Sequence, residues 1–199
     1  PPKHRPHARG NGRPPGAGRP GAEIMPIRNR LADWDGWKGC AGVMTGYFAE
    51  AGQGNIAASC IRDMKHANPE LYVLVDPVLG DGDSLYVAAD VAQAIRDALL
   101  PLATCISPIL FELAWLTGKP VSNRPDAVSA ARAMPCGEVL ATSIPVDAAS
   151  IATLAITTLE QAHVLSRLKP SVPHETGDVV PVLSLNFRLM GLRAPQVSD

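Results

Sequence analysis

The sequence predicts a three-layer α/β fold, in which helices flank a mainly parallel β-sheet. From about residue 40, short apolar runs alternate with longer helical segments, a pattern typical of β-α-β units with right-handed crossovers. The run at residues 71–75 is wholly apolar and is closed by Asp76-Pro77, as in a parallel strand that is buried on both faces. Hydrophobic residues make up 46% of the 199 residues and charged residues 19%, which is a globular composition.

The predicted elements alternate regularly along the first half of this region. Residues 43–47 form a strand that ends at a glycine, and residues 53–67 form a helix that stops at Asn68-Pro69, because the residue before a proline disfavours helical geometry. The buried strand at 71–77 follows, and residues 88–100 are again helical.

The second half continues the alternation and then changes to a pair of strands. Its predicted elements are a strand at 103–108, a helix at 110–117 closed by Gly118, a helix at 126–134, a strand at 138–143, a strand pair at 151–158 and 162–168, and a last helix from near 178 to near 191. Ligands of parallel α/β sheets gather at the carboxyl ends of the strands. The polar residues that close the runs are therefore candidates for the site: Asp76, Ser107, Thr142 and the turn before the last helix.

The chain divides into three parts by composition. Residues 1–22 hold six Pro, five Gly, five Lys or Arg and no acid, so we expect a disordered tail. Residues 23–39 are a lead-in without a clear pattern, and 40–199 form the folded domain. Taking the tail's five charges from the 18 basic residues leaves 13 against 19 acidic ones, a net charge of −6. The tail has no aromatic residue for base stacking, so nucleic acid is not an expected partner.

Several classes of protein are disfavoured. The sequence contains no run of about 18 apolar residues, so it predicts no transmembrane helix. Its start also lacks the apolar segment of a secretory signal. The four cysteines form no CxxC pair and only five histidines are present, which argues against a zinc site or a disulfide scaffold. We therefore expect a cytoplasmic protein with free thiols and no membrane partner.

The tetrapeptide Glu175-Thr176-Gly177-Asp178 precedes the last predicted helix. Backbone N–H groups and the positive end of a helix dipole can hold a developing phosphate charge there, while Asp178 accepts a proton from an attacking hydroxyl. The alternative is that Asp178 only caps the helix.

Two further acids occupy suitable positions for a cation. Asp76 ends a strand before the turn that contains Gly80 and Asp81, and such a carboxylate can order Mg²⁺ through water. Glu112, early in the helix at 110–117, can serve the same metal. The alternatives are that Asp76 only ends a strand and that Glu112 only complements the helix dipole.

Six short motifs follow one another in a fixed order. They are Thr45-Gly46-Tyr47, Lys65-His66-Ala67-Asn68-Pro69, Asp76-Pro77-Val78-Leu79-Gly80-Asp81, Phe111-Glu112-Leu113 with Leu116-Thr117-Gly118, Val139-Leu140-Ala141-Thr142-Ser143, and Thr176-Gly177-Asp178. In this order they resemble the TGY, KxANP, DPVMGD, FELxxLTG, VLVTS and GTGD motifs of the pyridoxal kinase branch of the ribokinase-like superfamily. The resemblance runs from about residue 40 to residue 192.

The resemblance implies a fold, a reaction and roles for particular residues. The fold is the ribokinase-like sheet, here lacking the family's N-terminal portion and C-terminal end. The reaction is phosphorylation of the 5′-hydroxymethyl group of pyridoxal or a related B6 vitamer by ATP. Asp178 is then the base that contacts this hydroxyl, and Gly177 and Thr176 belong to the anion hole.

The same resemblance implies a nucleotide site and a homodimer. Asp76 and Glu112 are expected to organise Mg²⁺ and the water around the phosphates. The other residues expected to line the nucleotide site are Ser107, Thr142, Arg167, Leu168, Lys169 and Pro170.

The chain departs from the family pattern at two site positions. Ile109 stands where the family has an asparagine three residues before the glutamate, and Glu175 replaces the first glycine of GTGD. With the absent N-terminal portion, these departures keep two alternatives open. One is a non-catalytic member that binds nucleotide weakly or serves as a partner subunit, and the other is a hydroxymethylpyrimidine kinase.

Overall fold

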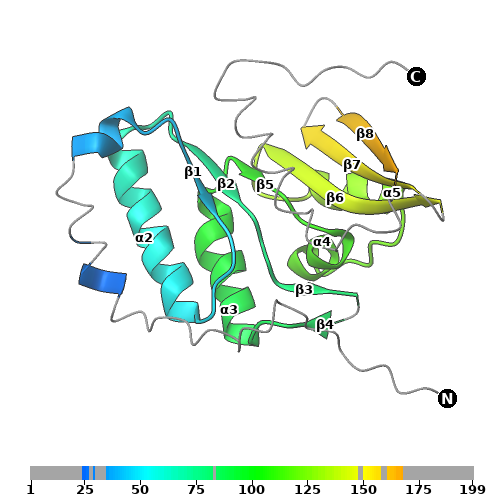
Figure 1. Ribbon diagram of the computed structural model, residues 1–199, viewed down its shortest axis with the longest axis horizontal. Coiled ribbons are helices and arrows are strands. Elements are labelled where there is room, and N and C mark those ends of the chain that lie inside the picture. Colours follow the sequence, from blue (N-terminus) through cyan, green and yellow to red (C-terminus); the bar gives the residue numbers. More distant parts are fainter. Residues whose placement is uncertain are drawn as a thin grey trace.

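The computed structural model describes residues 24–26, 29, 35–82, 84–147, 150–157 and 161–167. Six of the described strands form one sheet in the order β1-β2-β5-β6-β7-β8 (Figure 1). They are β1 (Gly42–Thr45), β2 (Tyr72–Val75), β5 (Cys105–Ile106), β6 (Glu138–Asp147), β7 (Ser150–Thr157) and β8 (Gln161–Arg167).

The sheet is parallel on one side and antiparallel on the other. Strands β1, β2, β5 and β6 are parallel neighbours, as the β-α-β pattern predicts. Strands β6, β7 and β8 pair antiparallel, which confirms the predicted strand pair and makes the sheet mixed. Strand β6 runs four residues beyond its predicted end at 143, because it continues into a ladder with β7 that includes two register shifts.

One described helical segment precedes β1, and the others connect the parallel strands. They are η1 (Asp35–Gly39), α2 (Ala51–Ala67), α3 (Ala89–Ala94) followed directly by η2 (Ile95–Leu99) and η3 (Leu100–Leu102), α4 (Leu110–Thr117) and α5 (Arg124–Arg132). The end of α2 is as predicted, because Asn68 before Pro69 is extended. Helix α5 begins two residues earlier than predicted, since the Asn123 side chain accepts a hydrogen bond from the Asp126 backbone N–H and caps it.

The described helices α2, α3, α4 and α5 all contribute residues to one hydrophobic core, which they share with one face of the sheet. That face carries a row of paired residues, Val75, Ile106 and Val139, and all three are buried in the core. The opposite face carries the neighbouring row of Met44, Leu74 and Cys105. The last predicted helix, from near residue 178, lies outside the described residues, and so do the tail at 1–22 and most of the lead-in at 23–39.

A short hairpin was not predicted from the sequence. Strands β3 (Gly80–Asp81) and β4 (Ser84–Leu85) pair antiparallel beside the sheet (Figure 1). Within the part of the chain that the structure describes, no helix is long and apolar enough to cross a membrane.

Candidate functional site

Asp76 and Ser107 lie side by side at the carboxyl ends of β2 and β5. The Ser107 hydroxyl donates a 2.9 Å hydrogen bond to Oδ1 of Asp76. The backbone fixes both residues, because Asp76 N donates to Thr45 O (3.2 Å) and Ser107 N donates to Val75 O (3.1 Å). The sheet hydrogen bonding thus extends one residue beyond β2 and β5, and it places two predicted site residues in contact.

Thr142 reaches the same edge of the sheet from β6. Its backbone N donates to Pro108 O (2.9 Å) and it forms an isolated parallel bridge with Ile109. The next residue, Ser143, is exposed and has a φ of 55°, in the left-handed region that a non-glycine residue rarely adopts. The chain therefore departs from a regular strand directly after Thr142, where the register of β6 and β7 shifts.

Thr45, the last residue of β1, pairs with Val75 and therefore lies in the row of residues that faces the hydrophobic core. Its hydroxyl oxygen is buried and has no hydrogen-bond partner among the described residues. Buried polar groups are normally paired, so this hydroxyl is an exception within the described part of the chain.

Glu112 is buried at the start of α4, with a side chain that accepts two backbone hydrogen bonds. Oε1 accepts from Leu79 N and Oε2 accepts from Ile109 N, each at 2.9 Å. Burial raises the pKa of the Glu112 carboxyl to about 7, and the nearby charge of Asp76 acts in the same direction. The backbone N–H groups of Leu79, Ile109 and Gly80 oppose this shift, because they favour the charged form.

The turn that follows Asp76 packs tightly on α4. A Cβ at Gly80 would overlap the carbonyl oxygen of Ser84 and the ring of Phe111. The turn therefore requires glycine at this position, and it leads into the β3–β4 hairpin. Beyond the hairpin, the backbone N–H of Tyr86 donates to Leu79 O (3.1 Å).

Two tyrosines that sequence reasoning left without a role lie near these acids. Tyr47 is 63% exposed and Tyr86 is 57% exposed. Partial burial raises the pKa of the Tyr86 phenol, and the charges of Glu112, Asp76 and Asp81 raise it further. Tyr47 belongs to the TGY motif, which pointed to it. Tyr86 follows the hairpin, and no periodic pattern or motif marks it.

Comparison with known proteins relates this chain to a family of kinases. No protein-family model matches the chain. It is 34% identical over 146 residues to the pyridoxine/pyridoxal/pyridoxamine kinase of Bordetella avium, covering 69% of this chain and 49% of that protein. It is 33% identical over 157 residues to the pyridoxal kinase PdxY of Deinococcus radiodurans, covering 72% and 53%. The chain is a homologue of the pyridoxal kinases.

Solved structures show that this homologue has the fold of the pyridoxal kinases. The pyridoxal kinase of Entamoeba histolytica superimposes with a TM-score of 0.77 at 24% identity, covering 86% of this chain and 63% of that one. A Leishmania donovani pyridoxal kinase, solved with ADP and pyridoxamine, gives 0.74 at 22% identity, covering 88% and 62%. The ribokinase-like fold predicted from the motifs is confirmed. The chain spans about half the length of the curated relatives it matches.

Several predicted site residues of the pyridoxal kinase homologue lie outside the described residues. They are Leu168, Lys169, Pro170, Thr176, Gly177 and Asp178, together with the departure at Glu175. Arg167 ends β8. The roles expected for these residues stay predictions, whereas Asp76, Ser107, Glu112 and Thr142 are placed by the structure at or beside one edge of the sheet.

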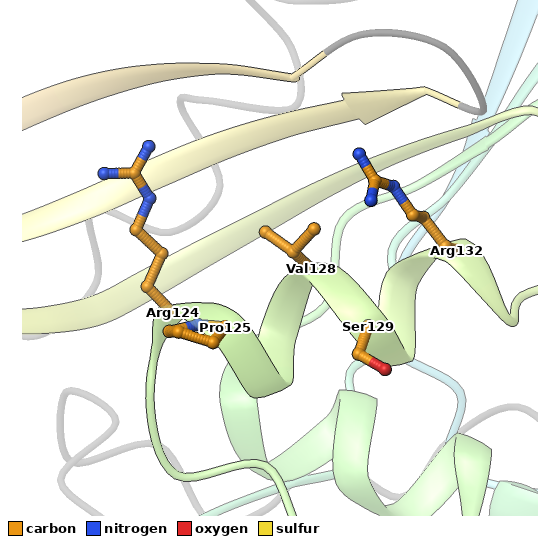
Figure 2. Close-up of a pocket in the computed structure, with 5 residues that line it drawn as sticks. All are labelled: Arg124, Pro125, Val128, Ser129 and Arg132. Atoms are coloured by element: carbon orange, nitrogen blue, oxygen red, sulfur yellow. The ribbon is translucent and has the colours of Figure 1, made fainter.

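Two open hollows of the homologue lie away from this edge. One, of about 470 Å³, follows α5, where Arg124 and Arg132 extend from the same side of the helix on either side of Val128 (Figure 2). The other, of about 640 Å³, lies at the amino ends of β2 and β6 and is lined by Gly39, Ala41, Asn68, Glu70, Tyr72, Thr104 and Glu138. Neither contains a predicted site residue.

Proposed function

We propose that this chain is part of an enzyme that phosphorylates the 5′-hydroxymethyl group of pyridoxal or a related B6 vitamer with ATP. The observation that carries the proposal is the polar edge of the sheet in a homologue of the pyridoxal kinases. There Asp76 and Ser107 are in contact where the parallel strands β2 and β5 end, and Thr142 on β6 pairs with the nearby Ile109. Ligands of parallel sheets bind at such an edge. Related structures were solved with ADP and pyridoxamine, or with AMP-PNP and PL.

Asp76 is the residue best placed for a hydrated Mg²⁺. It is partly exposed and fixed by Ser107. Among the described residues, no three His, Cys, Asp or Glu side chains gather into a metal-binding group. Mg²⁺ is commonly held by one or two carboxylates, phosphate oxygens and water, and Asp76 supplies one such carboxylate. When bound, Mg²⁺ supplies charge neutralisation for the phosphates.

The remaining catalytic roles are those predicted from the GTGD-like motif. Asp178 takes the proton of the attacking hydroxyl, and the backbone N–H groups around Thr176 and Gly177 stabilise the transferred phosphoryl group. Phosphoryl transfer depends mainly on positioning and charge neutralisation, which these groups supply. The exposed rings of Tyr47 and Tyr86 offer apolar surface to a planar ring of the substrate or nucleotide.

Formation of pyridoxal 5′-phosphate from pyridoxal and MgATP tests this proposal. We expect the purified chain to form the product and the Asp178→Asn variant to lose it, because an amide cannot act as the base. Circular dichroism and a cooperative unfolding transition establish that both proteins are folded. A folded wild-type chain that forms no product contradicts the proposal for this chain and favours the non-catalytic alternative.

One observation favours that non-catalytic alternative. Ile109 is the N-cap of α4, and its side chain has no atom that can bind a phosphate or a hydrated metal. ADP binding without turnover is the result that identifies a nucleotide-binding partner subunit.

The second alternative, a hydroxymethylpyrimidine kinase, also stays open. A putative phosphomethylpyrimidine kinase of Bacteroides thetaiotaomicron superimposes with a TM-score of 0.74 at 24% identity, covering 87% of this chain and 62% of that one. Offering hydroxymethylpyrimidine and pyridoxal in the same assay decides between the two substrates. The homodimer implied by the family resemblance also stays a proposal, which light scattering of the purified protein tests.

A further inference from the structure

We propose that Glu112 is a positioning residue: it ties the turn at residues 76–80 to the start of α4 and thereby sets the geometry of the nucleotide site. The sequence predicted a different role, in which Glu112 joins Asp76 as a metal-site carboxylate. The contacts of Glu112 support the positioning role.

Both oxygens of Glu112 are directed at the backbone. Oε1 accepts from Leu79 N in the turn, and Oε2 accepts from Ile109 N at the N-cap of α4, each at 2.9 Å. The two donors are thirty residues apart in the chain, so one carboxylate connects two segments that no described helix or strand pairing joins at this point. Hydrogen bonds from backbone N–H groups to a carboxylate are among the stronger ones in proteins.

A second contact reinforces the same connection. Phe111, the residue before Glu112, packs its ring where a Cβ at Gly80 would stand. Leu79 itself is fully buried. The first turn of α4 therefore holds the turn after β2 at two consecutive residues, Leu79 by a hydrogen bond and Gly80 by ring packing.

This connection positions groups on both sides of the turn. Asp76 precedes the turn and is fixed by Ser107. Asp81 and Tyr86 follow it on and after the β3–β4 hairpin, and the Tyr86 backbone N–H donates to Leu79 O (3.1 Å). A shift of Leu79 therefore moves the hairpin and Tyr86 relative to Asp76.

The surroundings of Glu112 are poor for a metal ligand. The residue is 4% exposed, and each oxygen already accepts a backbone N–H. A metal-bound carboxylate must direct a lone pair at the ion, and Mg²⁺ keeps several waters that need space. Asp76 is partly exposed and accepts a side-chain hydroxyl, so it suits a hydrated ion better.

Hydrogen exchange of the backbone amides tests the connection without any ligand. In the isosteric variant Glu112→Gln only the amide oxygen can accept a hydrogen bond, because the NH₂ group is a donor. The variant can therefore accept from only one of the two backbone N–H groups. We expect the amide of Leu79 or of Ile109 to exchange roughly tenfold faster or more. The matched control Glu70→Gln, at the other end of β2, should leave both amides unchanged. Unchanged exchange in Glu112→Gln overturns the proposal.

Binding of ADP over a range of Mg²⁺ concentrations tests the positioning role, and this part rests on the proposed nucleotide function. We expect Glu112→Gln to weaken ADP roughly tenfold at every Mg²⁺ concentration, with an unchanged half-saturating concentration of Mg²⁺. A raised half-saturating concentration with unchanged exchange makes Glu112 a metal ligand. Faster exchange with unchanged ADP affinity leaves Glu112 a purely structural role. Both results overturn the proposal.

Failure of the proposed function is distinguishable from failure of this inference. If the wild-type chain binds no ADP, the nucleotide function fails for this chain, and exchange at Leu79 and Ile109 still decides whether Glu112 holds the turn. If Glu112→Gln does not fold, Glu112→Asp takes its place in both measurements. Its shorter side chain cannot span both donors, so the same faster exchange and weaker ADP binding are expected.

Discussion

Glu112 shows at the scale of one residue how burial and hydrogen bonding compete. The backbone N–H groups around it favour the carboxylate, whereas removal from water favours the neutral acid. Burial prevails, because the pKa rises from 4.5 to about 7. Near neutral pH the folded protein therefore holds this proton more tightly than the unfolded chain does.

Stability should accordingly depend on pH through Glu112. The pKa of Glu112 is higher in the folded protein than in the unfolded chain, so protonation of this carboxyl stabilises the folded state. This contribution is fully present below about pH 4.5 and is lost as the pH rises to about 7. The change amounts to about 3 kcal/mol over this window. Urea unfolding of the metal-free wild type and of Glu112→Gln between pH 4 and 8 measures it.

We expect the stability of the wild type relative to Glu112→Gln to fall across that pH window and to level off above it. Glu70→Gln, which removes an exposed carboxylate at the other end of β2, serves as the control for the loss of one negative charge. Parallel pH profiles of the wild type and Glu112→Gln would show that Glu112 titrates at its ordinary pKa.

The start of α4 carries the main conflict between sequence and structure at the scale of elements. Ile109 occupies the N-cap with extended backbone angles, φ −78° and ψ 172°, a geometry that suits an asparagine, aspartate or serine. Its apolar side chain cannot accept a hydrogen bond from the first turn of the helix. Glu112 performs only the reverse half of a capping box, by accepting from Ile109 N.

Replacing Ile109 should therefore show what the missing cap is worth. We expect Ile109→Asn to be more stable than Ile109→Ala by about 1 kcal/mol, because only the asparagine side chain accepts a first-turn N–H. The alanine variant controls for the lost packing of a half-buried isoleucine. Chemical unfolding of both variants gives the difference. Equal stabilities would mean that the first turn of α4 gains nothing from a side-chain cap.

Elements with their own local signals were predictable, and contacts between distant segments were not. Proline and glycine signals located the ends of α2 and of α4, where Gly118 adopts a φ of 66°. Strands β3 and β4 have two residues each, too few for an alternating pattern. The bonds from Ser107 to Asp76 and from Leu79 to Glu112 join residues about thirty apart. Motif order placed these residues in one site, but only the fold shows which atoms meet.

At the scale of the whole molecule, the outer side of β1 is the exposed end of the described sheet. No described strand pairs with that side of β1. The carbonyls of Ala41 and Thr45 accept hydrogen bonds from β2, so the alternation of a strand directs the backbone groups of Gly42 and Met44 away from it. The Met44 side chain is 40% exposed. An edge strand with an apolar side chain and outward N–H and C=O groups is a site at which another strand can add.

This edge predicts self-association of the purified chain. We expect the apparent molecular mass in light scattering to rise with protein concentration, and Met44→Lys to reduce the rise, because a charge on an edge strand opposes pairing with a second copy. Gln93→Lys adds the same charge at an exposed position of α3 and should leave the association unchanged. Equal effects of the two lysine substitutions would show that the association depends on net charge. A wild-type chain that stays monomeric at every concentration would show that the β1 edge does not drive self-association. If Met44→Lys alone prevents association, the outer side of β1 is the surface through which copies of the chain meet.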